Sequence, residues 1–343
     1  SVASPESLVA YFDALPPLTN AGKARYALAL SSVGRPEAAA VAREAWRGGS
    51  MSATSEPYLL SIFGNQFSPA DDEARMDALL WQSRVLFEMD EALRNREIYI
   101  ALQPQLNIRS GRISSAEVLV RWTHPEMGVI SPAEFVQMAE RGKRIDQLTQ
   151  YVIQSSFQFL RDAQKIDPGF NIAVNISPSL IGSAEFEFML HAALRVYGVK
   201  ASSIMLEITE NEQLLNNSGA QDAMGRLRDA GFGISIDDYG AGLSTLTYLL
   251  KVPANEVKLD RTLISTLRYN ERSQLLIQST ISVAQSLGMH VVAEGVEDPD
   301  TLAILRTLEC NLAQGYFIGQ PVGAEEILSI LESSSSVQAV AQA

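Results

Sequence analysis

Strand-like segments alternate with helix-like segments along most of the chain after residue 97, and this alternation limits the possible folds more than any other feature. Eight segments have the short apolar character of buried strands, namely 98–102, 117–122, 170–176, 204–208, 234–237, 256–259, 290–293 and 313–317. Helical patterns separate most of them, as at 150–164, 184–196, 220–230 and 273–287. Eight strands with helical crossovers in ~250 residues predict an α/β fold, a closed (β/α)8 TIM-like barrel rather than an open sheet.

The first two strands are the exception to this alternation. Only residues 107–111 lie clearly between them, which is too short for a parallel crossover. We therefore expect one of these two strands to run antiparallel to its neighbours. An amphipathic helix at 84–95 leads into them.

Residues 1–81 have a different character and predict a small all-α domain. Ala-rich helical patterns at 21–30 and 37–46 are separated by Gly and Pro, which suggests an array of helical hairpins. Ser68, Pro69 and Asp71 have the order expected at the start of another helix. Nothing here suggests catalysis, and we expect a scaffold or an interaction surface. The chain is thus predicted to contain a helical domain at 1–81, a barrel at 82–335 and a disordered tail at 336–343.

The composition excludes several classes of protein. The net charge of −13 argues against wrapping nucleic acid, although bound cations would still admit a small anionic substrate. Cys310 is the only cysteine, which excludes an internal disulfide and a cysteine-based zinc site. No apolar run approaches the ~20 residues of a membrane helix, and residues 1–6 do not have the pattern of a signal peptide. Because the chain starts at Ser1 rather than Met, we expect a processed or excised piece.

Two adjacent carboxylates, Asp237 and Asp238, follow a short buried strand that begins at Gly233. Side chains alternate between the faces of a strand, so we expect both acids to reach one site only if the strand ends between them. Gly240 and Gly242 then indicate a sharp turn. An ionised carboxylate at the end of a buried strand is costly unless a cation or hydrogen-bond donors meet it. Taken alone, this stretch is explained equally well by an acidic turn.

Polar side chains interrupt seven of the apolar strands, mostly near their C-terminal ends. Barrel strands are buried on both faces and should be almost continuously apolar. In a (β/α)8 barrel the C-terminal ends of the strands meet at the face that carries the active site. We therefore favour a functional site over a structural network for Glu117, Asn175, Glu207, Asp237, Asp238, Lys258, Glu294 and Gln314.

The residue types indicate the chemistry of such a site. Carboxylate and amide oxygens without Cys or His favour Mg²⁺ or Mn²⁺ over zinc. Five carboxylates carry more negative charge than one divalent ion needs, which suggests two metal ions. Two ions ~3.5–4 Å apart can activate water and stabilise an in-line displacement at phosphorus. Lys258 could orient that water or neutralise developing charge. None of His124, His191 and His290 lies beside a Ser or Cys in a nucleophile arrangement, so acyl-enzyme chemistry is not expected.

A series of separated motifs runs in order through residues 84–332. A glutamate stands in Glu117-Val118-Leu119 and is followed by Arg121-Trp122 and His124-Pro125. The other motifs are Gln103-Pro104, Asn175-Ile176-Ser177, Leu206-Glu207-Ile208-Thr209-Glu210, Asp237-Asp238-Tyr239-Gly240, Lys258-Leu259-Asp260-Arg261, Ala293-Glu294-Gly295-Val296-Glu297 and Gln314-Gly315-Tyr316. This series resembles the EAL domain family, the cyclic di-GMP phosphodiesterases.

The resemblance implies an activity and residue roles. One phosphodiester of cyclic di-GMP would be opened to give linear pGpG, with Mg²⁺ or Mn²⁺ as cofactor and Ca²⁺ as an inhibitor. Catalysis would depend on Glu117, on Lys258 as the residue that positions water, on Gln314 as a support and on Glu210. Two metal ions would be held by Glu117, Asn175, Glu207, Asp237, Asp238 and Glu294. The nucleotide would lie near Gln103, Arg121, Asn175, Asp260, Glu297 and Tyr316, with Arg121 as the phosphate partner. We also expect a homodimer formed through the barrel and a cytoplasmic location.

Glu210 follows Glu207 by three residues and should lie just past the end of its strand. The resemblance implies that its carboxylate steadies the glycine-rich loop after Asp238, so that Asp238 faces the metal ions. The alternative is an exposed acid that caps the following helix.

Some positions depart from the family pattern, since Val118 replaces the usual Ala and Ser115 stands where Gly is common. None of the departures removes a ligand or Lys258. The first alternative to an active phosphodiesterase is an EAL domain that only binds cyclic di-GMP or a protein. The others are an unrelated metal-dependent barrel and a cell-wall interaction protein.

The last alternative comes from the first segment alone. Residues 8–81 resemble the helical superhelix of soluble lytic murein transglycosylases, most densely at 16–19, 44–47 and 68–81. The catalytic domain of that family has no counterpart in the sequence, so no activity is implied. That family acts on the cell wall outside the cytoplasm, which conflicts with the expected location. A natural fusion or an engineered join near residue 82 would each explain the combination.

Overall fold

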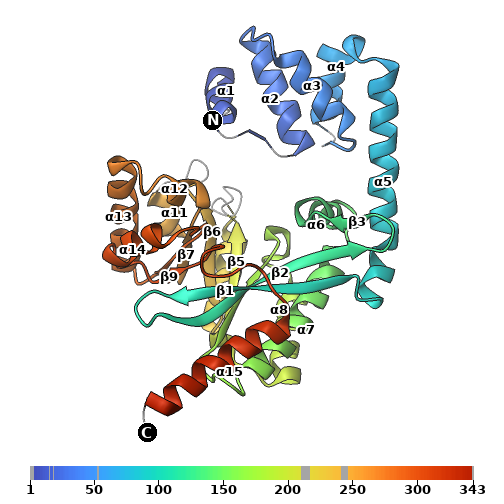
Figure 1. The fold of residues 1–343 in the computed structure, drawn as a ribbon. Coiled ribbons are helices and arrows are strands. Elements are labelled where there is room, and N and C mark those ends of the chain that lie inside the picture. Colours follow the sequence, from blue (N-terminus) through green and yellow to red (C-terminus); the bar gives the residue numbers. More distant parts are fainter. Residues whose placement is uncertain are drawn as a thin grey trace. The chain divides into compact units, whose positions relative to one another are not determined.

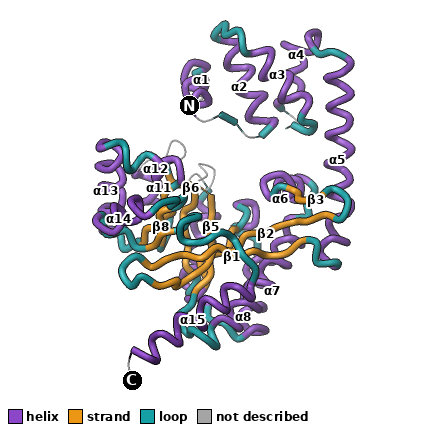
Figure 2. The backbone as a smooth tube through the Cα atoms, viewed as in Figure 1, coloured by secondary structure: helices purple, strands orange, loops and turns teal. Residues whose placement is uncertain are grey.

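The computed structural model describes residues 4–14, 16–17, 19–51, 54–209, 217–240 and 246–341. The chain forms two compact units, Ser1–Asp90 and Glu91–Ala343, which we call the helical unit and the barrel unit. The division falls within one long helix, α5 (Pro69–Arg94). In its described residues the helical unit has helices and no strands, whereas the barrel unit combines strands with helices (Figures 1 and 2).

Short helices form the helical unit, which confirms the all-helical prediction for this region. Small side chains allow close packing, because Ala24 and Ala27 of α2 and Ala42 and Ala45 of α3 are fully buried. The unit has its own hydrophobic core, to which these alanines belong. The helices before α5 are α1 (Pro5–Ala14), α2 (Asn20–Ser32), α3 (Ala38–Arg47) and α4 (Ser55–Phe63), followed by the 3₁₀ turn Gly64–Gln66.

The start of α5 is held by Asp71, whose side chain is 1 % exposed. Its Oδ2 accepts hydrogen bonds from the backbone N–H and the hydroxyl of Ser68 at 2.7 and 2.8 Å. The side chains of Arg47 and Arg43 lie 2.5 and 3.7 Å from the same carboxylate. The hydrogen bonds from Ser68, its backbone N–H first, and the neighbouring Arg47 lower the pKa of Asp71 to about 2. The helix start predicted at Ser68 is confirmed.

Helix α5 continues to Arg94 without a break, where the sequence suggests a separate helix from residue 84. Residues 70–94 contain neither Gly nor Pro, so nothing interrupts the helix. Val85, Met89 and Ala92 are buried and share one face of α5 through their spacing of four and three residues.

The barrel unit is built on one sheet that closes on itself. Its strands follow the order β1-β9-β8-β7-β6-β5-β4-β2, and β1 also pairs with β2. Strand β1 is antiparallel to both neighbours and the other neighbouring strands of the barrel are parallel, which confirms the predicted (β/α)8 barrel and its antiparallel strand. The barrel strands are β1 (Ile98–Asn107), β2 (Arg112–His124), β4 (Asn171–Asn175), β5 (Ile204–Thr209), β6 (Gly233–Tyr239), β7 (Glu256–Leu259), β8 (His290–Ala293) and β9 (Leu312–Ala313), and β3 (Gly128–Ile130) pairs with β2 outside the barrel.

Helices connect the parallel strands and surround the barrel (Figure 1). In the described part of the chain, every helix is too short or too polar for a membrane span. The helices are α6 (Pro132–Arg141), α7 (Ile145–Ala163), α8 (Ala184–Tyr197), α10 (Ser218–Asp229), α11 (Leu246–Lys251), α12 (Arg261–Ser265), α13 (Glu271–Ser286), α14 (Pro299–Thr307) and α15 (Ala324–Ala341), with 3₁₀ turns at Pro178–Leu180 and Ala201–Ser203.

The end of the barrel unit differs from the sequence expectation in two places. The strand expected at 313–317 ends at Ala313, because the Gly315 carbonyl accepts turn hydrogen bonds from the N–H groups of Ile318 and Gly319. Where a disordered tail is expected from residue 336, the backbone of α15 stays helical to Ala341. Ala and Gln favour helix, and extending a helix costs less than starting one.

Candidate active site

The polar side chains predicted at the strand ends are contributed from all round the barrel. In a closed barrel alternate residues of each strand point inward, so residues at the C-terminal strand ends can meet at one face. The side chains are Glu117 of β2, Asn175 of β4, Glu207 of β5, Asp237 and Asp238 of β6, Lys258 of β7, and Glu294 and Gln314 directly after β8 and β9. Hydrogen bonds and ion pairs among them show that most of these side chains contact one another.

Lys258 joins four of the acids, and its side chain is 1 % exposed. Its Nζ lies 2.8 Å from Glu294, 3.0 Å from Asp237, 3.1 Å from Glu207 and 3.4 Å from Glu117. Burial alone would lower the pKa of Lys258, but the carboxylates, Glu207 first, raise it well above its ordinary value. The site therefore contains a buried lysine that pairs with four carboxylates.

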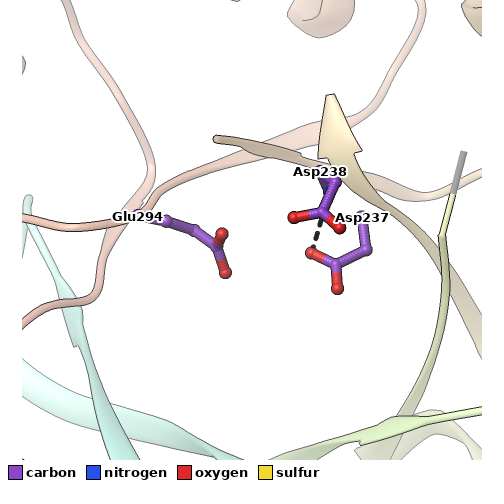
Figure 3. Close-up of side chains that lie close together, drawn as sticks. All are labelled: Asp237, Asp238 and Glu294. Carbon is purple, nitrogen blue, oxygen red and sulfur yellow. Dashed lines mark hydrogen bonds between the residues drawn. The ribbon is translucent and has the colours of Figure 1, made fainter. Parts of the chain in front are cut away.

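An irregularity in β6 brings Asp238 to the same site. Between Ile236 and Tyr239 the strand has one more residue than its partner β7, which is a β-bulge. Asp238 has a φ of 56°, in the left-handed region that non-glycine residues rarely adopt. The carboxylates of Asp237 and Asp238 consequently lie side by side and face Glu294 (Figure 3). Both acids reach one site although the strand continues through them, so the expectation that the strand must end between them is wrong.

Three of these acids lie close enough together to share one cation. Oxygen atoms of Asp237, Asp238 and Glu294 all lie within 4.8 Å of one another (Figure 3). Divalent cations bind oxygen at about 2.0–2.6 Å, so oxygens at this separation can share one ion. Among the described residues, Glu207 Oε1 is buried and makes no hydrogen bond. A buried carboxylate oxygen without a donor is costly, and a nearby cation would satisfy it. The residues present therefore fit divalent metal ions.

One lysine does not neutralise the acids, and their pKa values reflect this. Burial, followed by repulsion from Asp237, raises the pKa of Asp238 to about 6. Burial raises the pKa of Glu294 to about 7. Burial and the charge of neighbouring acids raise the pKa of Glu207 well above its ordinary value. Additional positive charge at the site would reverse these shifts.

Glu117 is held differently, by two amides. Asn175 Nδ2 donates to its Oε1 at 2.8 Å, and Gln314 Nε2 donates to its Oε2 at 2.5 Å. Burial raises the pKa of Glu117, but Lys258 and these two amides outweigh it and keep the pKa below its ordinary value. Glu117 is thus an ionised carboxylate whose orientation is set by its neighbours.

Comparison with known proteins places this geometry in a family. The family model described as EAL domain matches residues 88–321, more than half of the chain. The chain belongs to the EAL domain family. The match begins inside helix α5 and includes every strand of the barrel.

Individual EAL relatives agree. Cyclic di-GMP phosphodiesterase NbdA of Pseudomonas aeruginosa is 36 % identical over 236 residues, which cover 68 % of this chain and 30 % of that protein. Cyclic di-GMP phosphodiesterase RocR of the same species is 33 % identical over 242 residues, 71 % of this chain and 62 % of RocR. The c-di-GMP complex of the PaMucR phosphodiesterase superimposes with a TM-score of 0.66 at 31 % identity, covering 71 % of this chain and 99 % of that one. The chain thus matches less than two thirds of the length of NbdA and of RocR.

A cavity of about 220 Å³ opens beside the acids of the EAL domain. Its lining includes six predicted site residues, Gln103, Glu117, Glu294, Glu297, Gln314 and Tyr316. Arg261, Gly295 and Gly315 also line it and are not among the predicted site residues. Arg261 forms an ion pair with Glu297 at 2.8 Å, and a side chain at Gly295 would collide with that of Arg261. The sequence feature that could have identified Arg261 is its position directly after Asp260, in the motif that begins at Lys258.

Three of the remaining predicted residues do not line this cavity. Arg121 and Asn175 line a second cavity of about 310 Å³, where the Arg121 guanidinium donates to the Val120 carbonyl at 2.9 Å. Asp260 caps helix α12 by accepting from the Thr262 N–H at 2.8 Å. Glu210 lies outside the described residues.

Proposed function

We propose that this EAL domain hydrolyses one phosphodiester bond of cyclic di-GMP and releases linear pGpG. The observation that carries the proposal is the group of carboxylates around Lys258, to which the β6 bulge adds Asp238. In the reaction, water attacks phosphorus, one ester P–O bond breaks, and the leaving oxygen takes a proton. The two relatives named cyclic di-GMP phosphodiesterases support this substrate.

The reaction would use two Mg²⁺ or Mn²⁺ ions. When bound, the ions would supply the positive charge that lowers the pKa of the attacking water and stabilises charge at phosphorus. The donor set contains only oxygen atoms, which suits these ions. The residues that would hold them are Glu117, Asn175, Glu207, Asp237, Asp238 and Glu294.

Lys258 would position the attacking water. Its protonated Nζ can donate a hydrogen bond to the water oxygen and leave a lone pair free for phosphorus. Its ion pairs with four carboxylates would keep Nζ within the group of acids. Gln314 would support the reaction by holding Glu117 in place.

The two cavities would receive the nucleotide. Glu297 could accept hydrogen bonds from the N–H groups of a guanine, and Tyr316, whose side chain is exposed, offers a ring for stacking. Arg121 would contact a phosphate oxygen from the second cavity. Gln103 and Asp260 complete the expected contacts, although each already makes a hydrogen bond within the protein.

Several features remain predictions about the chain. These are a homodimer formed through the barrel, a cytoplasmic location, and a domain boundary at residue 82. The resemblance of residues 8–81 to transglycosylases also stays a prediction.

The proposed function can be tested by product analysis. Cyclic di-GMP is incubated with the protein and Mg²⁺ or Mn²⁺, and the products are separated by chromatography. A single product, pGpG, is expected, carrying one solvent oxygen when the water is isotopically labelled. Ca²⁺ should support little turnover because it prefers a larger and looser ligand shell. Intact substrate after long incubation of folded protein with Mn²⁺ would instead favour a domain that only binds the nucleotide.

A further inference from the structure

A row of buried polar side chains lies beside the carboxylate group, and two of them have no part in the function proposed above. Strands β1 and β2 place Gln103 opposite Glu117 and Gln105 opposite Ser115. Residues two apart on a strand share a face, so these four side chains occupy one face of the β1–β2 pair. Each of them is at most 9 % exposed, and Gln314 beside them is 4 % exposed.

Hydrogen bonds connect these side chains in one continuous series. The Ser115 hydroxyl donates to Gln105 Oε1 at 2.7 Å. Gln105 Nε2 donates to Gln314 Oε1 at 2.8 Å. Gln314 Nε2 then donates to Glu117 Oε2 at 2.5 Å and to Gln103 Oε1 at 3.1 Å. The Ser115 hydroxyl is therefore linked to Glu117 through two amides.

The acceptors determine which group donates in each hydrogen bond of this series. An ionised carboxylate can only accept, so Gln314 must turn its Nε2 toward Glu117 and its Oε1 toward Gln105. Gln103 adds the same constraint, because its Nε2 donates to the Gly319 carbonyl at 3.2 Å and leaves its Oε1 to accept from Gln314. Gln105 must then present its Nε2 to Gln314, and its own oxygen needs a donor. Ser115 supplies that donor.

We propose that Ser115 and Gln105 are positioning residues that fix the Gln314 amide, so that Glu117 is held with its free lone pairs toward the metal ions. The inference rests on the proposed metal-dependent hydrolysis. Without the Ser115 hydroxyl, the Gln105 amide can rotate and turn its oxygen toward Gln314. Gln314 Oε1 then loses the donor that Gln105 supplies, so the amide that holds Glu117 is fixed only by its Nε2 bonds to Glu117 and Gln103. Asn175 still donates to the other oxygen of Glu117, so the effect should be a weakened ligand rather than a lost one.

The test uses the full chain and a matched control. Ser115→Ala removes the first donor, Gln105→Leu removes the connecting amide, and a double variant removes both. Ser156→Ala is the control, because it removes a buried hydroxyl of α7 that donates to the Val152 carbonyl at 2.6 Å. Each metal-stripped protein is titrated with Mn²⁺, with free Mn²⁺ measured by electron paramagnetic resonance. The kcat and KM for cyclic di-GMP and the unfolding temperature are measured on the same samples.

Ser115→Ala and Gln105→Leu should each weaken Mn²⁺ binding and lower kcat by ~10-fold, with KM changed by less than about twofold, as for other outer partners of metal ligands. The double variant should be no worse than the more impaired single variant, because both residues act through Gln314. Ser156→Ala should bind Mn²⁺ like the unchanged protein.

Two results would overturn the inference. One is Mn²⁺ affinity within about twofold of the unchanged protein in both single variants. The other is losses that add in the double variant and follow the unfolding temperature, as general destabilisation would produce. If the unchanged protein itself bound no Mn²⁺, the proposed function would fail, which is a distinct outcome from either of these.

Discussion

Each unit of the chain buries a carboxylate almost completely. Only in the helical unit do neighbouring donors and cations balance the charge of that carboxylate. Asp71 in the helical unit accepts hydrogen bonds from Ser68 and pairs with Arg47. Glu207 in the barrel unit shares Lys258 with three other carboxylates, and one of its oxygens has no donor among the described residues. The charge of Asp71 is thus balanced by the groups around it, whereas the charge of Glu207 is not.

The pKa values of the two acids move in opposite directions. Donors lower the pKa of Asp71 to about 2, and burial raises that of Glu207 well above its ordinary value. At neutral pH a lowered carboxyl pKa stabilises the fold and a raised one destabilises it. Burial of an acid therefore does not distinguish structure from function. The balance between charges and donors does, and a group of acids that exceeds its cations marks a candidate site.

Glu207→Gln should have the largest effect. Turnover should fall at least ~10³-fold because a metal ligand loses its charge. The unfolding temperature should stay the same or rise, because a neutral amide removes one buried charge from an under-neutralised group. Chromatography of the products and circular dichroism on the same preparation measure both. Retained turnover with a lower unfolding temperature would make Glu207 a structural residue.

Glu210→Ala should have the next largest effect. If Glu210 steadies the loop after Asp238, turnover should fall at least ~10²-fold, as when a supporting group misplaces a reacting one by ~1 Å. Folding and the unfolding temperature should change little. Near-normal turnover in this variant would assign Glu210 to the cap of the following helix.

Asp71→Asn should show the opposite pattern to Glu207→Gln. Turnover should stay within about twofold of the unchanged protein, while the unfolding temperature of the helical unit falls because the ion pairs with Arg47 and Arg43 are lost. The folded pKa of Asp71 lies below its ordinary value of 3.8. Its contribution to stability is therefore present above that value and is lost as the pH falls through about 2. Unfolding curves recorded toward acid pH should show this loss in the unchanged protein. If Asp71→Asn unfolded with the same acid dependence, the loss could not be assigned to Asp71.

Removal of the helical segment should have the smallest effect on turnover. A chain that begins at Ser83 keeps the buried face of α5 formed by Val85, Met89 and Ala92. It contains every described acid of the site, so it should fold and hydrolyse cyclic di-GMP at a similar rate. If it folds but is inactive, the helical segment completes the site or the dimer.

The sequence was sufficient for the barrel and for the residues that face its end, because strand periodicity and the polar interruptions are local signals. It predicted Asp238 as a site residue but not how Asp238 reaches the site, since alternation along β6 places it opposite Asp237. The bulge that overrides this is a property of the pairing with β7. Gln105 was missed for a similar reason: it lies beyond the predicted 98–102 segment, in the part of β1 that pairing with β2 extends.

Divalent cations are expected to balance the acids of the barrel, and one titration tests this most directly. Metal-stripped protein is titrated with Mn²⁺ in the presence of cyclic di-GMP, with bound metal and turnover measured in the same samples. Two bound ions per chain are expected, turnover should rise with their occupancy, and Asp238→Asn should lose at least one ion. Full turnover in excess chelator, or no bound Mn²⁺ above background in folded protein, would contradict a metal-dependent site.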